Sequence, residues 1–214
     1  MAQYLNIHTH KIKKEGIELV NTASYNEINN DGSFSFGLHP WNIEKDDAEK
    51  TIEQLKKLCE DKKIIAVGEI GLDRAIKTPL GIQQKLFLSQ VEIAVEFDLP
   101  AIIHSVRANS DLIQVYKHLK TNKPWVFHGF RGSLQEARQI IDIQCYLSFG
   151  KALIYHEKTQ KVLQNVSLDQ VFFETDDSDE KISTIYKKAA ELLDICIEKL
   201  KEKIYSNFTR VFGL

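Results

Sequence analysis

The chain has 214 residues, of which 43% are hydrophobic and 27% are charged. This composition is that of an ordinary globular protein, and the length suits one folded domain over residues 1–214. The formal net charge of −2 argues against a protein that coats duplex nucleic acid through many Lys and Arg contacts.

No apolar run approaches the roughly 20 residues that a membrane-spanning helix needs, and no signal peptide is visible. The three cysteines, Cys59, Cys145 and Cys196, are scattered and form no C-x-x-C pair. We interpret them as buried free thiols, with Cys59 and Cys196 on apolar faces of helices, which suits a reducing cytoplasm. The sequence therefore predicts a cytoplasmic protein without a thiolate zinc site.

Short apolar runs alternate with amphipathic segments along the chain. The runs predict strands over residues 4–7, 17–22, 35–38, 64–69, 100–104, 125–127, 146–149 and 171–174. Apolar residues at spacings of three and four predict helices over residues 46–59, 82–97, 112–119, 133–141, 156–163 and 185–200. Asp46 followed by Glu49, and Ser133 followed by Glu136, resemble capping boxes at the starts of two of these helices.

Eight strands that mostly alternate with helices predict a parallel sheet with helices outside it, closed as a TIM-like (β/α)8 barrel. A typical barrel of this kind has about 250 residues, so this one must be trimmed. Residues 11–16, between the first two expected strands, are too few for a covering helix, so we expect the first two β-α connections to be the short ones. An open, doubly wound sheet is the structural alternative.

Polar side chains stand where most of the expected strands end. They are His8, His10, His39, Glu69, His104, His128 and Asp176. In such barrels the residues that carry out chemistry come from the C-terminal ends of several strands. His8 and His10 are two residues apart on an extended chain, so both imidazoles can reach one ion. Glu69 ends an apolar strand, where a carboxylate is costly to bury without a positive partner.

Each of these residues also has an ordinary structural explanation. Glu69 could pair with an arginine, and His104 or His128 could be a core histidine bonded to a backbone carbonyl. Taken together, polar residues at six of the eight strand ends are better explained by a shared metal site in which Glu69 bridges two ions.

Several short motifs give these residues a familiar context. They are Ile7-His8-Thr9-His10, Gly37-Leu38-His39-Pro40, Gly68-Glu69-Ile70-Gly71-Leu72-Asp73, Ile102-Ile103-His104-Ser105, His128-Gly129-Phe130, Glu174-Thr175-Asp176 and the closing residues 207–214. With them the chain resembles the TatD family of metal-dependent hydrolases, best known as deoxyribonucleases, within the amidohydrolase-type barrels. The resemblance spans nearly the whole chain, and the G-E-I-G-L-D stretch is its most specific motif.

The resemblance implies a cofactor of two divalent metal ions, with zinc, manganese and magnesium as the candidates. One ion would be held by His8, His10, Glu69 and Asp176, and the other by Glu69, His104 and His128. The resemblance also implies an enzyme that cleaves DNA at the ends of single strands. We expect it to act as a monomer, with no membrane and no obligate protein partner.

Four positions depart from the family pattern. Asn6 stands where the family has Asp, Val106 separates Ser105 from Arg107, Arg131 replaces a serine, and Asp177 follows Asp176 where small residues and Pro are common. None of these changes removes an expected metal ligand, so they bear on the substrate.

The mechanism that we infer uses two cations as a clamp for in-line attack at phosphorus by a water that they activate. Asp176 is the candidate base, since a carboxylate at the metal edge can take the proton and pass it to the leaving oxygen. Asp73 would orient a metal ligand from behind. His39 would contact the scissile phosphate, and Arg107 and Arg131 would hold flanking phosphates. A solvated surface position is the plainer interpretation of the two arginines.

Other activities stay open from the sequence. PHP-type phosphoesterases also begin with H-T-H, but they need more early histidines and a late D-x-H motif. Cyclic-amide hydrolases often carry a carboxylated lysine on the fourth strand, where this chain has Glu69. The same metal chemistry could cleave another phosphoester, an amide, or an ester such as that of aminoacylated RNA. A non-catalytic metal-binding protein is the alternative from a different class.

Overall fold

The computed structural model describes residues 3–22, 24–29, 32–119 and 121–213. Leu214, the last residue of the closing motif, lies outside the described residues. The strands are β1 Leu5–Thr9, β2 Ile17–Asn21, β3 Ser33–Phe36, β4 Ala66–Asp73, β5 Ala101–Val106, β6 Trp125–Phe127, β7 Tyr146–Phe149 and β8 Val171–Phe173. The α-helices are α1 Ala48–Glu60, α2 Leu80–Glu96, α3 Asn109–His118, α4 Leu134–Asp142, α5 Ala152–Tyr155, α6 Glu157–Gln164, α7 Ile182–Leu193 and α8 Ile197–Phe212.

The strands form one eight-stranded sheet in which chain order and spatial order are the same, β1 to β8. The pairings of β1 with β2, β3 with β4, β4 with β5 and β7 with β8 are parallel. A parallel bridge between Thr9 and Asp176 then joins the end of β1 to the residues that follow β8. A parallel sheet whose last strand meets its first has the connectivity of a (β/α)8 barrel. The barrel prediction is confirmed, and the open doubly wound sheet is excluded because its strands would follow a different order.

The first two connections are short, as expected. Residues 10–16 join β1 to β2, and residues 22–32 join β2 to β3 around a single 3-10 turn at Tyr25–Glu27. In the parts of these connections that the structure describes, no α-helix is present, and the first one is α1, after β3. The barrel is therefore trimmed at its beginning.

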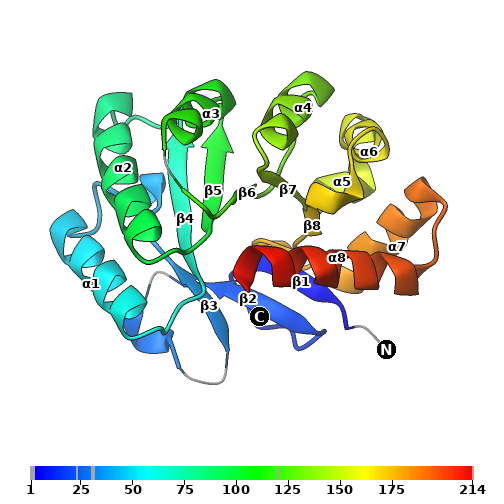
Figure 1. Cartoon of the computed structure of the whole chain (residues 1–214), viewed down its shortest axis with the longest axis horizontal. Coiled ribbons are helices and arrows are strands. Elements are labelled where there is room, and N and C mark those ends of the chain that lie inside the picture. The colour runs from blue at the N-terminus through cyan, green and yellow to red at the C-terminus, as the bar shows by residue number, and fades with distance from the viewer. Residues whose placement is uncertain (1–2, 23, 30–31, 120, 214) are drawn as a thin grey trace. The chain divides into compact units, whose positions relative to one another are not determined.

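Contacts divide the chain into two compact units, one of Met1–Val20 with Phe127–Leu214 and one of Asn21–Val126. In the second unit, α2 packs along β4, α3 contacts β5, and α1 packs on α2 (Figure 1). In the first unit, α8 packs on β1 and β8 and also contacts α7 (Figure 1). Helices thus cover strands within each unit.

Two glycines allow β4 to lie unusually close to β5. Gly68 and Gly71 have φ of +154° and +155°, a region that favours glycine. A Cβ atom on Gly71 would lie 1.9 Å from the carbonyl oxygen of His104, and one on Gly68 would lie 2.7 Å from the carbonyl oxygen of Ile102. Only glycine therefore fits at these two positions, on either side of Glu69.

Glu69 does not end the fourth strand, so the sequence-based boundary is wrong. β4 is buried along its length and continues to Asp73. Its register with β5 shifts between Val67 and Ile70, which marks a bulge or similar irregularity. Glu69 lies inside this irregularity, and the carboxylate is presented from within a buried strand.

The last expected helix, over residues 185–200, is two helices. α7 ends at Leu193 and α8 begins at Ile197, and Asp194 between them has φ of +51°. A left-handed residue ends an α-helix, and Asp adopts this conformation more readily than most residues. Cys196 is the N-cap of α8 and is exposed, so its assignment as a buried thiol was wrong. Cys59 is buried as expected, and burial together with nearby glutamates raises the pKa of its thiol to about 12.

The two predicted helix caps had different outcomes. Ser133 and Glu136 form the capping box at the start of α4, with the Ser133 N–H donating to the Glu136 carboxylate over 2.7 Å. At α1 the cap is Asp47, one residue later than predicted, and its carboxylate accepts from the N–H of Lys50 over 3.1 Å. Boundaries of this kind are rarely fixed to better than a residue or two.

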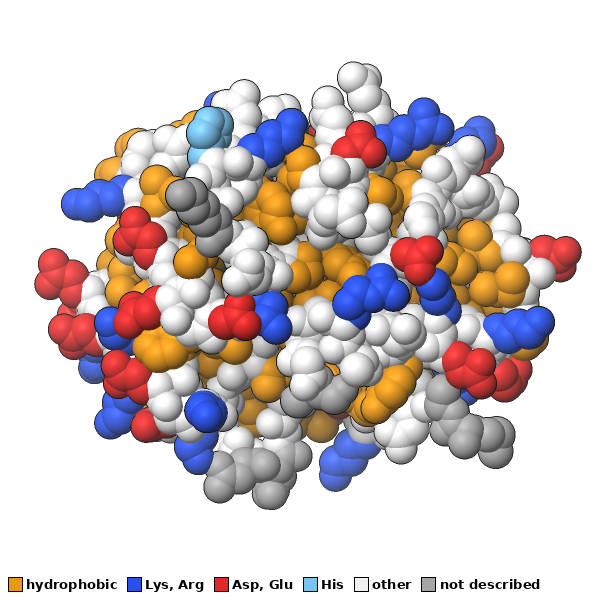
Figure 2. Space-filling view, viewed as in Figure 1, with side chains coloured by type: hydrophobic (Ala, Val, Ile, Leu, Met, Phe, Trp, Pro, Cys, Tyr) orange, Lys and Arg blue, Asp and Glu red, His pale blue; other side chains and the backbone are white. Residues whose placement is uncertain are grey.

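None of the helices that the structure describes is long and apolar enough to cross a membrane. On the face drawn in Figure 2, Lys and Arg side chains are interspersed with Asp and Glu side chains. This mixture agrees with the net charge of −2.

Candidate metal centre

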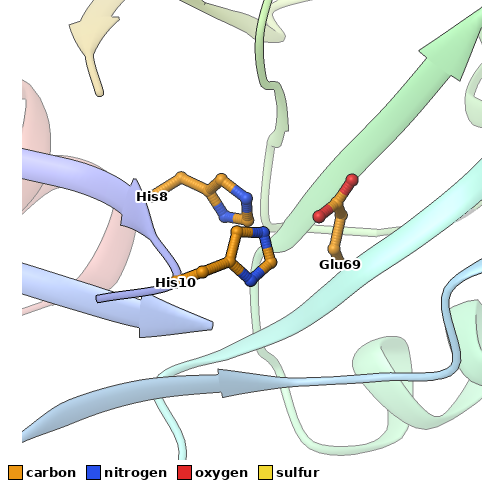
Figure 3. Close-up of side chains that lie close together, drawn as sticks. All are labelled: His8, His10 and Glu69. Atoms are coloured by element: carbon orange, nitrogen blue, oxygen red, sulfur yellow. The ribbon is translucent and has the colours of Figure 1, made fainter. Parts of the chain in front are cut away.

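Three side chains of the first unit converge from the ends of different strands. His8 comes from β1, His128 follows β6 and Asp176 follows β8, and one ligand atom of each lies within 4.8 Å of the others. We call these residues the first triad. Asp176 Oδ1 is 3.7 Å from His8 Nε2 and 3.4 Å from His10 Nε2. Figure 3 shows the rings of His8 and His10 on the same side of the end of β1.

Burial differs within the first triad. The His8 side chain is fully buried, whereas the Asp176 side chain is 32% exposed. His8 is therefore held by the protein interior, and Asp176 can still meet a water molecule or a bound substrate. The φ of Asp176 is +52°, and the backbone of this residue is fixed by hydrogen bonds with the end of β1.

A second group of three lies in the second unit and consists of His39, Glu69 and His104, which we call the second triad. Glu69 Oε1 is 3.0 Å from His39 Nε2 and 2.7 Å from His104 Nδ1. The Glu69 side chain, drawn in Figure 3, is only 6% exposed, so the carboxylate is surrounded by imidazoles rather than by water. An imidazole can stabilise a buried carboxylate by donating a hydrogen bond or by sharing a cation with it.

The hydrogen bonds of His39 define its tautomer. The backbone N–H of Trp41 donates to His39 Nδ1 over 3.1 Å, so Nδ1 carries no proton. The proton of the neutral ring is then on Nε2, which faces Glu69 Oε1. In this arrangement His39 is a hydrogen-bond donor, and its Nε2 is not free to bind a metal.

His104 has a carboxylate on each side of its ring. Nδ1 faces Glu69, and Nε2 is 3.3 Å from Asp73 Oδ2. Histidines that bind metals commonly donate their other N–H to a carboxylate, which fixes the ring and its tautomer. Asp73 is positioned to accept the N–H of His104 Nε2. His104 Nδ1 is then the ring atom that could bind an ion beside Glu69.

Asp73 is itself tightly held. Its Oδ2 accepts from Trp41 Nε1 over 2.7 Å, and its Oδ1 accepts from the N–H of Ala75 over 2.7 Å. Burial by itself raises the pKa of Asp73, but the hydrogen bonds from Trp41, Ala75 and His104 outweigh burial and leave the pKa below its ordinary value. Asp73 is therefore a charged anchor for His104 at neutral pH.

Glu174 is a buried carboxylate next to the first triad. Its Oε1 accepts from the N–H of Gly129 over 2.6 Å and lies 3.4 Å from His128 Nδ1. No role for Glu174 or Trp41 was predicted from the sequence, although Glu174 belongs to a quoted motif and Trp41 follows one. A polar or aromatic residue two positions from a motif histidine or aspartate is the signal that could have identified them.

Asn6 and Thr175 form a second set of supporting residues. The Asn6 amide nitrogen donates to Thr175 Oγ1 over 2.8 Å, and the Asn6 amide oxygen accepts from the N–H of Thr175 over 3.0 Å. Both residues are buried. They connect β1 to the residue before Asp176.

The two candidate arginines differ in position. Arg131 lines a pocket that also includes Lys151, Glu174 and Asp176. Arg107 is exposed beyond the end of β5 with φ of +54°, and no hydrogen bond or ion pair joins its side chain to any other of the described residues. The structure thus places Arg131 beside the first triad and leaves Arg107 at the surface.

The donor atoms of the first triad, and those of Glu69 and His104 in the second triad, suit a divalent metal ion. Both sets offer imidazole nitrogen and carboxylate oxygen, a mixture that binds zinc or manganese well and magnesium less well. Two of the donor residues, His8 and Glu69, are buried, so the surrounding protein fixes the positions of their side chains. His10 lies within reach of Asp176 at the edge of the first triad.

The profile of the family described as TatD related DNase matches residues 4–213 of the chain. Over 150 residues the chain is 35% identical to YjjV of Escherichia coli, named an uncharacterized metal-dependent hydrolase, and this match covers 68% of the chain and 58% of YjjV. Over 118 residues it is 32% identical to a Schizosaccharomyces pombe protein named deoxyribonuclease Tat-D, covering 53% of the chain and 38% of that protein. These sequence matches span less than two thirds of the length of either relative.

Among solved structures, the crystal structure of YjjV, described as a TatD homolog from Escherichia coli, has a TM-score of 0.88 to the chain. The superposition covers 99% of this chain and 98% of that one, at 24% sequence identity. An identity this low shows the fold alone, and the fold agrees with the strand order found here.

Proposed function

Because this chain belongs to the TatD-related DNase family of metal-dependent hydrolases, we propose that it hydrolyses phosphodiester bonds in DNA. The first triad carries the proposal, because it gathers imidazole and carboxylate donors from three strand ends with ligand atoms within 4.8 Å. Strand ends are where barrels of this kind place their chemistry.

The ligands of the proposed ions follow the family resemblance. One ion would be held by His8, His10 and Asp176 together with Glu69. A second ion would be held by Glu69, His104 and His128. The contacts of Glu69 with His104, and of Asp176 with His8 and His10, support these assignments. Bound divalent cations supply positive charge for a phosphate and lower the pKa of water, so that it attacks at neutral pH.

Asp176 is the proposed base. Its carboxylate is one-third exposed, so it can accept a proton from the attacking water and return that proton to the leaving oxygen. Its backbone is held by β1, so the carboxylate keeps its place during the transfer.

His39 is the proposed contact to the scissile phosphate. Its Nε2 carries the proton of the neutral ring and faces Glu69 Oε1 over 3.0 Å. Once Glu69 holds metal, this N–H would turn from the carboxylate to a phosphate oxygen. Asp73 positions His104 through the contact of 3.3 Å to Nε2.

Arg131 is the proposed contact to a flanking phosphate, which its guanidinium can bind through two hydrogen bonds. Its place in the pocket beside Asp176 supports this role. Lys151 lines the same pocket, and its ammonium group pairs with Asp177 Oδ1 over 3.2 Å. Asp177, which departs from the family pattern, thus holds a second positively charged side chain beside Arg131. For Arg107 we also propose a contact to a flanking phosphate.

We further propose that residues 1–214 act as one catalytic domain, as a monomer and on the ends of single strands. The buried thiols of Cys59 and Cys145 suit a reducing compartment, and we propose the cytoplasm.

The test is hydrolysis of end-labelled single-stranded DNA by the purified, metal-analysed protein. Reactions contain Mg²⁺, Mn²⁺, Zn²⁺ or a chelator, and Asp176→Asn is assayed alongside. Metal-dependent shortening from one end, lost with the chelator and in the variant, is the expected result.

A folded, metal-loaded protein that leaves DNA intact with every metal would overturn the nuclease proposal. The same preparation is then assayed on small phosphoesters, amides and aminoacylated RNA, which are the other substrates that this chemistry allows. Hydrolysis of none of them would favour a non-catalytic metal-binding protein.

A further inference from the structure

Trp41 is a large aromatic residue held at the surface beside the second triad. It is 56% exposed, whereas the other tryptophan, Trp125, is 2% exposed. Single exposed aromatic residues are common on proteins. Trp41 differs from a common surface residue because its ring is fixed by a buried partner.

Two hydrogen bonds fix Trp41. Its indole Nε1–H donates to Asp73 Oδ2 over 2.7 Å, and its backbone N–H donates to His39 Nδ1 over 3.1 Å. Asp73 is 2% exposed, and Pro40, the residue before Trp41, is also buried. The indole is thus ordered before any ligand arrives, which reduces the entropy cost of binding to it.

Among the described residues, the rings that contact the indole of Trp41 meet it at steep angles rather than in parallel. The ring of His39 is centred 5.1 Å from that of Trp41 at an interplanar angle of 86°, and the ring of His104 is 5.9 Å away at 74°. Both contacts are edge-type, and more than half of Trp41 is accessible. A flat group entering the site can therefore stack on the indole while its charged end lies at the second triad.

We propose that Trp41 is a stacking platform for a nucleobase, and that it selects unpaired nucleotides as substrate. This inference rests on the proposed nuclease function and names what that site recognises. Every base has a π-face, so stacking tolerates any sequence. In a duplex, however, both faces of an internal base are covered by its neighbours, and a terminal base stays paired and stacked on its inner face. An unpaired base is therefore the one that can turn freely to place its face on Trp41 while its phosphate lies at the second triad.

The binding test uses tryptophan fluorescence of the metal-loaded protein. Stopped-flow mixing with a short oligothymidylate records the emission before cleavage proceeds, and an abasic strand of the same length provides the same phosphates without bases. We expect oligothymidylate to quench the emission and the abasic strand to leave it unchanged. The buried Trp125 gives a constant background, and Trp41→Phe removes the quenching.

The kinetic test compares Trp41→Phe with Trp41→Ala. Stacking on one aromatic side chain strengthens binding by about 5- to 150-fold, so Trp41→Ala raises KM for oligothymidylate by that factor relative to Trp41→Phe. Both variants lose the hydrogen bond to Asp73, so any change in kcat is the same in the two. Trp41→Phe keeps a ring and most of the affinity. The abasic strand has the same KM with all three proteins. Tyr205→Ala, which removes an aromatic residue that is 44% exposed on α8, is the matched control and leaves both KM values unchanged.

The outcomes separate the two proposals. Both variants lose the hydrogen bond to Asp73, so an equal loss in Phe and Ala, seen with both strands and in kcat, would assign Trp41 to positioning of Asp73 and overturn stacking. Cleavage of DNA with equal KM for base-bearing and abasic strands would also overturn stacking and leave the nuclease proposal standing. Failure of the loaded protein to bind or cleave DNA would overturn both.

Discussion

Asn6 and Thr175 lie 169 residues apart in the sequence and are joined by two hydrogen bonds in the protein interior. The contact begins a directed chain, in which the Asn6 amide donates to the Thr175 hydroxyl, that hydroxyl donates to Thr9 Oγ1 over 3.1 Å, and Thr9 Oγ1 donates to the carbonyl of Lys11 over 2.9 Å. An aspartate at position 6 has no proton to donate at the start of this chain. The asparagine found here is therefore matched to Thr175, whose hydroxyl continues the chain to Thr9.

Asn6→Ala is expected to destabilise the protein. It leaves the N–H and hydroxyl of Thr175 without their buried partner, and a loss of this kind costs about 1–3 kcal/mol. Urea unfolding measures the difference in the free energy of unfolding. Asn165→Ala is the control, because Asn165 is exposed and its side-chain amide donates to the carbonyl of Lys161 in the preceding helical turn. Equal stabilities for the two variants would contradict the role assigned to Asn6.

Glu69→Ala is expected to lose both metal ions and nearly all activity, since the proposed role of Glu69 is to bridge them. Metal content per protein, measured after gel filtration, is the direct readout. Glu69→Gln keeps the shape of the side chain but removes its charge, so it shows whether the charge is what holds the ions. Two ions retained in Glu69→Ala would refute the bridging role.

Asp176→Asn is expected to retain at least one metal ion and to lose turnover. Proton transfer by a positioned side chain contributes about 10²- to 10⁴-fold, so kcat should fall within that range. Circular dichroism and metal analysis show whether the variant is folded and loaded. Turnover close to that of the wild type would exclude Asp176 as the base.

Gly71→Ala and Gly81→Ala form a matched pair with opposite expected effects. At Gly71 the new Cβ would overlap the carbonyl of His104, so stability should fall by about 3 kcal/mol or the protein should fail to fold. Gly81 is in α2 with nothing within 4 Å of the new atom, so alanine there should raise stability by about 0.5–1 kcal/mol. Thermal unfolding compares them, and a well-folded Gly71→Ala would show that β4 and β5 can move apart.

The barrel could be predicted because its signal is distributed along the chain. Each strand was a short apolar run, and errors of a few residues at its ends did not change the order of elements. Ser33 begins β3 two residues before the predicted boundary, for example, and the sheet order is unaffected. The connection of residues 11–16 is likewise so short that its length alone predicted the lack of a helix between β1 and β2.

The local errors have conformational causes. Glu69 was placed at a strand end because a carboxylate after an apolar run usually stops a buried strand, but the register shift beside two glycines lets β4 continue. The break at Asp194 was missed because apolar residues on both sides keep helical spacing, while the left-handed φ of one residue leaves no periodic signal.

The candidate site was predictable in its ligands and less so in its supporting residues. Histidines and carboxylates at strand ends are visible in the sequence, since topology brings strand ends together. The contact of Trp41 with Asp73 spans 32 residues and depends on the direction of one side chain, which no spacing rule reports.

The bridge between Thr9 and Asp176 has a consequence for how the protein is made. His8 is synthesised before Asp176, which follows only after β8 has been made. A nascent chain, or a fragment cut anywhere between them, lacks a complete first triad. Assembly of the first triad therefore requires an unbroken polypeptide from β1 to the residues after β8.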